Sequence, residues 1–263
     1  MRWKVTKTDK PKTAPVLNER LHFLDEVRGF LVVLMIFYHG FYTAGYVYNF
    51  RIGRTLFHFF EPVEPLFAGA FIVLCGFCCH LSRNNLKRGS LLLLVSLLLT
   101  GFTLLFFEPG DYIWFGILHL LAVCILLFCL LQRCFRHVPP LVGLLVCAFL
   151  AAFTWNLPNY AGYFLGFPHF LRWDLPVAWQ NCRWLCPLGI GDVPAGDYFP
   201  LIPWVFVFFG GSFLGELCRR RQFPSWWKPS RLPALSFVGR HALLLYVLHQ
   251  PVIYGLLFLV EKL

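Results

Sequence analysis

Seven apolar runs, each long enough to cross a lipid bilayer as a helix, constrain this chain more than any other feature of its sequence. The hydrocarbon core of a bilayer is about 30 Å thick, so a crossing helix needs roughly 20 mostly apolar residues. Charged side chains are expensive in that core, and every lysine accordingly lies in a terminal tail or between the runs. The predicted spans are residues 24–42, 63–82, 90–107, 112–131, 138–155, 200–217 and 235–259.

The amino-acid composition predicts the same fold class. Hydrophobic residues make up 58% of the 263 residues and charged residues 14%. A soluble domain of this length cannot bury so much apolar surface, so we predict an all-α, polytopic integral membrane bundle of about seven transmembrane helices. The formal charge of +10 does not indicate a nucleic-acid partner, because the basic residues collect at the ends of the apolar runs, where they orient helices in a bilayer.

The distribution of basic residues predicts how the chain is oriented in the membrane. With the N-terminus inside, seventeen Lys and Arg residues fall on the cytoplasmic side and five on the other side. This split predicts a cytoplasmic N-terminus and an extracytoplasmic C-terminus. Residues 1–20 are then a basic cytoplasmic tail and residues 21–263 the membrane domain. The tail lacks the pattern of a cleaved signal peptide, so we expect a multi-pass protein of a bacterial cell membrane that retains its first helix.

Two segments on the predicted outer side carry many aromatic residues. Residues 43–62 mix Tyr, Arg and His side chains, a composition suited to the membrane interface or to the mouth of a substrate site. Residues 156–199 are too long for a simple connection and too aromatic for disorder, so we expect a re-entrant or surface-lying lid. Most of the ten cysteines lie inside predicted spans, but Cys182 and Cys186 lie in this lid, where a local disulfide and two free thiols are the alternatives.

Three histidines come to a similar depth in three different predicted spans. His39 lies near the outer end of the first span, and at about 1.5 Å of rise per residue His119 and His249 fall in the outer half of theirs. A neutral imidazole at this depth can remove a proton from an amine or a hydroxyl group, although a hydrogen-bonded packing role is the alternative. No HxxxH or HxxE spacing occurs on a span, so we expect no metal.

Several charged residues lie at the ends of the predicted spans, and more than one role is open for Asp25, Arg28 and Asp197. Asp25 and Arg28 share one helical face, where they either pair with each other or hold the phosphate of an anionic ligand. Arg240 and His241 lie near the start of the last span, on the same inner side. Asp197 precedes the sixth span, where it either caps a helix or binds a cationic amino sugar or orients a histidine.

Five segments, in order along the chain, resemble a family of membrane acyltransferases typified by heparan-alpha-glucosaminide N-acetyltransferase and its bacterial relatives. The segments are LDEVRGFLVVLMIFYH at 24–39, PLFAGAFIVLCGFCCHLSR at 65–83, FGILHLLAV at 115–123, DYFPLIPWVFVFFGGSFLG at 197–215 and LSFVGRHALLLYVLHQP at 235–251. The first, fourth and fifth are the specific ones. The resemblance implies a helix bundle that transfers an acetyl group from cytosolic acetyl-CoA to an amino sugar, or another saccharide, on the far side of the membrane.

The resemblance and the residue patterns together give the predicted site. The predicted base is His39. His58 is the second candidate, because in the lysosomal branch of the family the position matching His39 looks like Asn and a histidine follows in the next outer segment. The residues expected to contact acetyl-CoA are Asp25, Arg28, Arg240 and His241. The residues expected to contact the acceptor are His119, Asp197, His249 and Gln250.

Several alternatives stay open from the sequence. The acceptor either attacks the thioester directly, with the histidine as base, or receives the acetyl group from an acetyl-histidine. An O-acetyltransferase of a cell-surface glycan is the alternative enzyme, and a transporter or exporter of a polar solute is the alternative from another class. A homo-oligomer is one alternative for the assembly.

Overall fold

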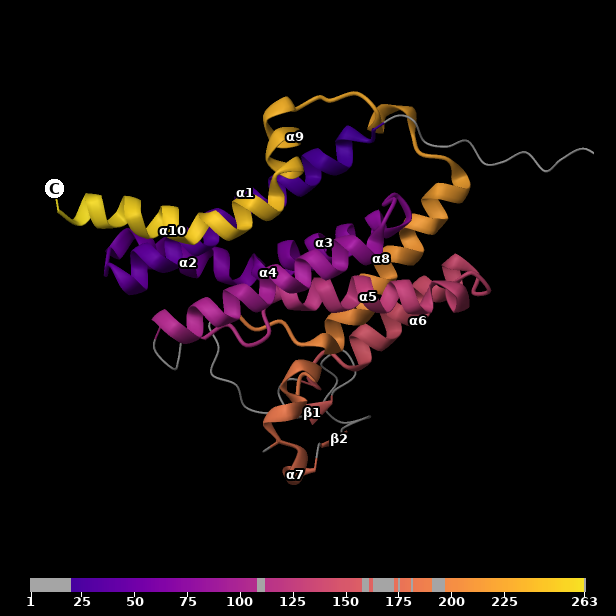
Figure 1. The fold of residues 1–263 in the computed structure, drawn as a ribbon, viewed down its shortest axis with the longest axis horizontal. Coiled ribbons are helices and arrows are strands. Elements are labelled where there is room, and N and C mark those ends of the chain that lie inside the picture. Colours follow the sequence, from indigo (N-terminus) through magenta and orange to yellow (C-terminus); the bar gives the residue numbers. More distant parts are fainter. Residues whose placement is uncertain are drawn as a thin grey trace, which may run out of the picture.

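The computed structural model describes residues 20–107, 112–157, 161–162, 173–174, 176–180, 182–190 and 197–262. Helices dominate this part of the chain, whose strands are limited to one antiparallel pair of two residues each, β1 (Ala161–Gly162) and β2 (Trp173–Asp174). The predicted all-α fold class is confirmed, and the long helices form an elongated bundle (Figure 1). The predicted tail, apart from Arg20, and about half of the predicted lid of residues 156–199 lie outside the described residues.

Six helical segments are long and apolar enough to cross a membrane, and a seventh apolar helix is shorter. The six segments are His22–Val47, Arg51–His80, Asn85–Phe106, Ile117–Phe135, Leu201–Arg221 and Ala242–Glu261, and the seventh is Pro140–Phe153, with 14 residues. The α-helices are α1 (His22–Tyr42), α2 (Arg51–Phe60), α3 (Glu64–Phe77), α4 (Asn85–Phe106), α5 (Ile117–Phe135), α6 (Pro140–Phe153), α7 (Val177–Gln180), α8 (Leu201–Arg221), α9 (Pro233–Arg240) and α10 (Ala242–Glu261).

The structure differs from the predicted spans at two places. The second helical segment begins at Arg51 rather than at residue 63, because α2 is amphipathic: Gly53 and Phe57 are buried while Arg51, Arg54 and His58 are exposed. A hydropathy pattern averages over both faces of such a helix and so misses it. The predicted last span, 235–259, is broken at residue 241 into α9 and α10.

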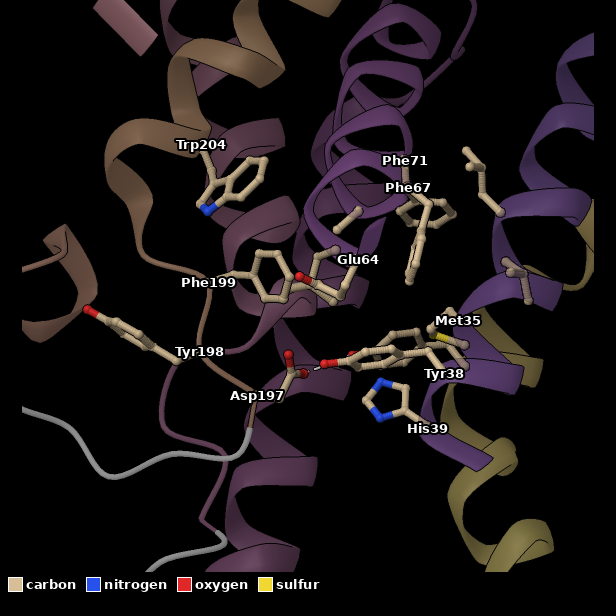
Figure 2. A pocket seen from close by; sticks show the side chains of 15 residues that line it. Met35, Tyr38, His39, Glu64, Phe67, Phe71, Asp197, Tyr198, Phe199 and Trp204 are labelled. Carbon is tan, nitrogen blue, oxygen red and sulfur yellow. Dashed lines mark hydrogen bonds between the residues drawn. The ribbon is translucent and has the colours of Figure 1, made fainter. Parts of the chain in front are cut away.

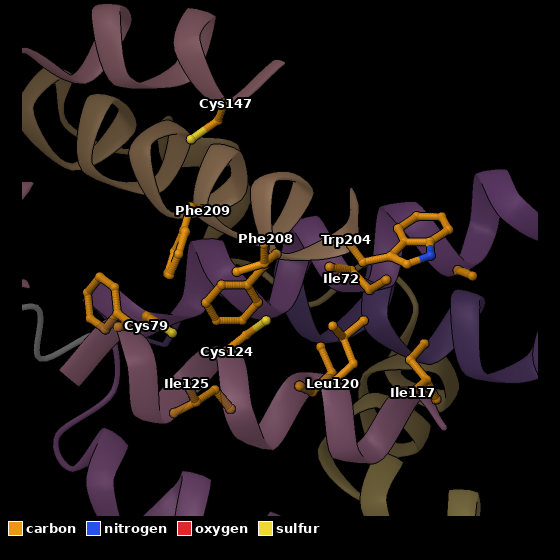
Figure 3. Close-up of a cluster of buried hydrophobic side chains, with 14 of the residues drawn as sticks. Ile72, Cys79, Ile117, Leu120, Cys124, Ile125, Cys147, Trp204, Phe208 and Phe209 are labelled. Atoms are coloured by element: carbon orange, nitrogen blue, oxygen red, sulfur yellow. The ribbon is translucent and has the colours of Figure 1, made fainter. Parts of the chain in front are cut away.

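The core of the bundle lies where α3, α5 and α8 meet (Figure 3). Ile72, Leu120 and Phe208, one from each helix, have no exposed surface. Because lipid is as apolar as these side chains, close packing rather than removal from water holds such a core together. Large apolar side chains on α4 and α10 remain exposed, as expected for helices that face lipid, and they include Leu94, Leu98, Phe102, Leu248, Val252 and Leu259.

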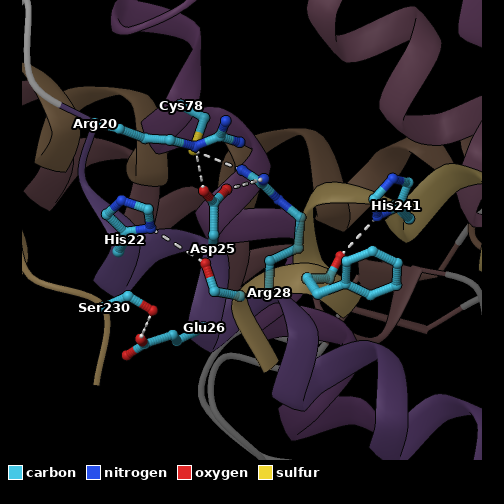
Figure 4. A network of polar contacts seen from close by, with 10 residues as sticks. Arg20, His22, Asp25, Glu26, Arg28, Cys78, Ser230 and His241 are labelled. Atoms are coloured by element: carbon cyan, nitrogen blue, oxygen red, sulfur yellow. Dashed lines mark hydrogen bonds and ion pairs between the residues drawn. The ribbon is translucent and has the colours of Figure 1, made fainter. Parts of the chain in front are cut away.

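The start of α1 is fixed to the start of α9 by a buried carboxylate. Glu26 is 7% exposed, and its Oε1 accepts hydrogen bonds from the backbone N–H groups of Arg231 (2.7 Å) and Leu232 (2.8 Å) and from the Ser230 hydroxyl (3.2 Å). These groups lie immediately before α9, so the carboxylate satisfies donors at the positive end of that helix. Figure 4 shows Glu26 and Ser230 facing each other beside α1.

Close backbone contact continues one turn further along the same two helices. A Cβ atom at Gly29 would overlap the carbonyl oxygen of Leu235, and one at Gly239 would overlap the carbonyl oxygen of Asp25. Only glycine therefore permits this crossing, and small residues of this kind are typical of tightly packed membrane helices.

We predict that Gly29→Ala destabilises the protein while Gly101→Ala, the matched control on α4, does not. Position 101 has no atom within 4 Å of an added Cβ, whereas at position 29 the helices must separate. Overpacking of this kind costs about 1–3 kcal/mol, so the melting temperature in detergent should fall by several degrees for Gly29→Ala alone. Equal melting temperatures for the two variants would contradict the described crossing.

Candidate active site

A cavity of roughly 260 Å³ lies where α1 ends and where α3 and α5 begin (Figure 2). Its polar lining comprises Tyr38, His39, Glu64, Asp197, Tyr198 and Tyr246. Its apolar lining includes Leu31, Val32, Met35, Phe67, Phe71 and Trp204. An apolar cavity with a few convergent polar groups is the usual form of a small-molecule site, so this is the candidate active site.

Asp197 is the most deeply placed carboxylate of the cavity. Its Oδ2 accepts a hydrogen bond from the Tyr246 hydroxyl at 3.0 Å. Burial raises the pKa of the Asp197 carboxyl above its ordinary value, and the bonds from Tyr246 and from the Ile117 backbone N–H act against that rise. The predicted alternative that Asp197 caps the sixth span is wrong, because α8 begins at Leu201 with Pro200 at its N-cap.

Glu64 brings a second carboxylate to the same cavity. It is the first residue of α3 and lines the cavity together with Asp197. Within the described part of the chain its carboxylate has no hydrogen-bond or ion-pair partner, and the cavity lining contains no Lys or Arg. Two carboxylates that face one cavity without a balancing cation favour a ligand that carries positive charge.

His39 reaches the cavity from the last two turns of α1. The described residues offer no hydrogen-bond partner to its ring nitrogens, while its backbone carbonyl accepts a bond from the Thr43 hydroxyl at 2.9 Å. Figure 2 shows His39 and Asp197 directed toward the same space from opposite sides. An imidazole with free ring nitrogens at a cavity wall can act as a base or as a nucleophile.

His249 lies behind His39, on α10. The two ring centroids are 5.0 Å apart, and His249 is 8% exposed. The neighbouring Gln250 accepts a bond from the Thr43 hydroxyl at 3.4 Å, so the end of α1 and the middle of α10 are joined at two successive residues. His249 and Gln250 are thus close to the cavity without lining it.

The other two candidate histidines lie elsewhere. His119 is buried against α4, where its Nε2 is 3.1 Å from the Thr100 hydroxyl, so the three histidines predicted at one depth do not share one cavity. His58 is exposed and bonds to the Tyr46 hydroxyl and to Glu61, each at 3.2 Å. The described residues contain no group of three or more His, Cys, Asp or Glu side chains that could hold a metal ion.

The residues predicted to contact acetyl-CoA lie at the opposite end of α1 (Figure 4). Arg28 donates to Asp25 Oδ1 at 3.1 Å and to the Cys78 thiol at 3.2 Å, and Arg20 donates to Asp25 Oδ2 at 2.7 Å. Of the two alternatives for Asp25 and Arg28, the structure therefore contains the one in which they pair with each other.

The remaining two members of that group lie on α9 and at its end. Arg240 is exposed, and His241 bonds to the carbonyl oxygen of Phe237 in its own helix at 2.9 Å. Binding of acetyl-CoA by this end of the bundle stays a prediction.

All ten cysteines are free thiols, Cys182 and Cys186 included.

Four polar residues of the cavity were not predicted from the sequence, namely Tyr38, Glu64, Tyr198 and Tyr246. Glu64 carried a usable signal, because it is an ionisable residue directly before an apolar run and such residues are seldom placed there without a role. Tyr246 lies three residues before His249 and so shares its helical face.

Comparison with known protein families finds a match to the family described as Heparan-alpha-glucosaminide N-acetyltransferase, catalytic, over residues 20–251. No curated protein matches the chain, and no solved structure does.

Proposed function

The chain belongs to the heparan-alpha-glucosaminide N-acetyltransferase catalytic family, and from this premise we propose that it transfers an acetyl group from cytosolic acetyl-CoA to an amino sugar on the other side of the membrane. The family is one of membrane acetyltransferases, and the six long apolar helices fit an integral multi-pass protein. The donor, the acceptor and the sides of the membrane belong to the proposal.

One observation carries this proposal: an imidazole lies across a single cavity from two carboxylates. His39 supplies the imidazole, and Glu64 and Asp197 supply the carboxylates. The apolar part of the cavity, around Val32 and Phe71, extends from these groups toward the middle of α1. That arrangement suits a long, thin acyl carrier that arrives from one end and an acceptor that arrives from the other.

In the direct scheme, the nitrogen of the acceptor amine attacks the thioester carbonyl carbon while His39 removes a proton from that amine. The C–S bond breaks, the new C–N bond remains, and the CoA thiolate takes up a proton. In the two-step scheme a His39 ring nitrogen attacks the thioester first, the C–S bond breaks, and the CoA thiolate takes up the proton that the ring loses. The acceptor amine then attacks the acetyl carbon of acetyl-histidine, the bond from that carbon to the ring breaks, and the ring takes up the amine proton. Both schemes need the unprotonated ring nitrogen of His39 to face the cavity.

The carboxylates favour an amine over a neutral hydroxyl acceptor. An amino sugar arrives as an ammonium ion, which pairs with Glu64 and Asp197 and gives one proton to a carboxylate. The resulting free amine is the species that loses its second proton to His39 during the attack. Aromatic side chains at the same cavity, Phe199 and Trp204, offer flat apolar faces against which a sugar ring can pack.

We predict that His39→Ala abolishes most of the transfer activity and that His58→Ala does not. Loss of a general base typically lowers kcat by about 10²–10⁴-fold. The measurement is transfer of radiolabelled acetyl from acetyl-CoA to glucosamine by the purified protein in nanodiscs. If the His39→Ala variant kept full activity and the His58→Ala variant had none, the exposed His58 would be the base instead.

We predict that Glu64→Gln raises the KM for glucosamine while Glu61→Gln, its matched control, leaves that KM unchanged. Glu61 is exposed and bonds to His58 rather than lining the cavity. A hydrogen bond to a charged group contributes about 1.5–3 kcal/mol, so the expected rise is roughly 10- to 100-fold. The KM for acetyl-CoA should not change, and a rise of that constant instead would place Glu64 on the donor side.

A further inference from the structure

One ring nitrogen of His249 is hydrogen-bonded, and the other has no hydrogen-bond partner among the described residues. Its Nδ1 lies 2.5 Å from the backbone carbonyl oxygen of Tyr246. A carbonyl oxygen only accepts hydrogen bonds, so Nδ1 carries the hydrogen and, in the neutral ring, Nε2 is an acceptor. Nε2 is buried, and no described residue bonds to it.

A buried acceptor without a hydrogen-bond donor is rare in proteins. The question is therefore which neighbour of His249 can donate a hydrogen bond to its Nε2. The Tyr246 hydroxyl donates to Asp197, and the Thr43 hydroxyl donates to the carbonyl oxygen of His39. Gln250 is the next residue of the helix, and its side chain therefore projects about 100° away from that of His249. Among the described neighbours the ring of His39 is the donor that remains. Its centroid is 5.0 Å from that of His249, and the two rings face each other without a hydrogen bond in this structure.

We propose that His249 is a positioning residue, whose Nε2 accepts the ring N–H of His39 and thereby leaves the other His39 nitrogen unprotonated toward the cavity. This inference rests on the proposed function and adds to it the group that fixes the tautomer of the base. An imidazole in which neither nitrogen has a partner divides between two tautomers, and in one of them the nitrogen toward the cavity carries the hydrogen. A catalytic base held by a third group is the general arrangement that avoids this loss.

Two substitutions of His249 separate positioning from packing. His249→Gln keeps an acceptor in the form of the amide oxygen, although it cannot take up a proton, and His249→Leu removes the acceptor while filling the space. If the proposal holds, kcat for acetyl transfer to glucosamine falls on the order of 10²-fold for His249→Leu, because a misplaced catalytic group costs about that much. It should stay within severalfold of the wild type for His249→Gln, and the KM for acetyl-CoA should be unchanged in both.

The matched control is His137→Leu. His137 is also bonded through Nδ1 to a backbone carbonyl, that of Arg133 at 3.0 Å, but it is exposed and lies in the α5–α6 connection, away from the cavity. Its substitution should leave kcat unchanged. An equal fall of kcat in the Gln and Leu variants of His249, or no fall in either, would overturn the proposal.

A spectroscopic measurement tests the same inference without any enzyme assay. In protein labelled with ¹⁵N-histidine, the wild-type His39 ring should give one tautomer, with a single protonated nitrogen in a hydrogen bond, and His249→Leu should turn it into a mixture. The His39 signals are assigned by their loss in His39→Ala. If the wild type transfers no acetyl group, the proposed function fails but the single tautomer remains. A tautomer mixture at His39 in the wild type overturns the positioning role even if transfer is observed.

Discussion

The docking of α1 against α9 and α10 is the constraint on which the candidate active site depends. At one end of α1 the buried Glu26 carboxylate holds the backbone that leads into α9, and a turn later Gly29 and Gly239 bring the two helices into backbone contact. Thirteen residues after Glu26, a distance of roughly 20 Å along the helix, His39 reaches the cavity. A straight helix fixed in rotation at one end has its side chains fixed in direction at the other. The contacts near Glu26 therefore set where the imidazole of His39 points.

This arrangement gives a structural meaning to the charged motif at the start of the chain's first helix. Asp25 and Glu26 are both buried, and each is satisfied by several donors, so neither carboxylate is left unpaired in an apolar setting. Arg28 completes the set by bonding to Asp25 and to Cys78 of the neighbouring helical segment. Asp25 and Arg28 are thus paired in this structure and join neighbouring helices. The candidate active site lies at the far end of the same helix.

The depth of a residue along its membrane helix was predictable from the sequence. The direction of its side chain around the helix axis was not. Counting residues along the apolar runs placed His39, His119 and His249 at one level, and the structure brings the first and third together. His119 faces α4 because its rotation about the α5 axis depends on packing against Thr100, which no local pattern reveals. Glu64 was missed although it directly precedes an apolar run, because the start of α3 depends on the amphipathic α2 that comes before it.

The proposed mechanism requires the reactive carbon of an acyl-CoA to meet His39 inside the cavity, and a structure with a non-hydrolysable acetyl-CoA analogue would reveal whether it does. We expect the carbonyl carbon of the analogue at roughly 3–3.5 Å from a ring nitrogen of His39, the separation of a near-attack geometry. We also expect the pantetheine arm along the apolar wall beside Val32 and Phe71. An analogue whose carbonyl lies out of reach of His39, or whose arm leaves the cavity past Asp197, would contradict that mechanism.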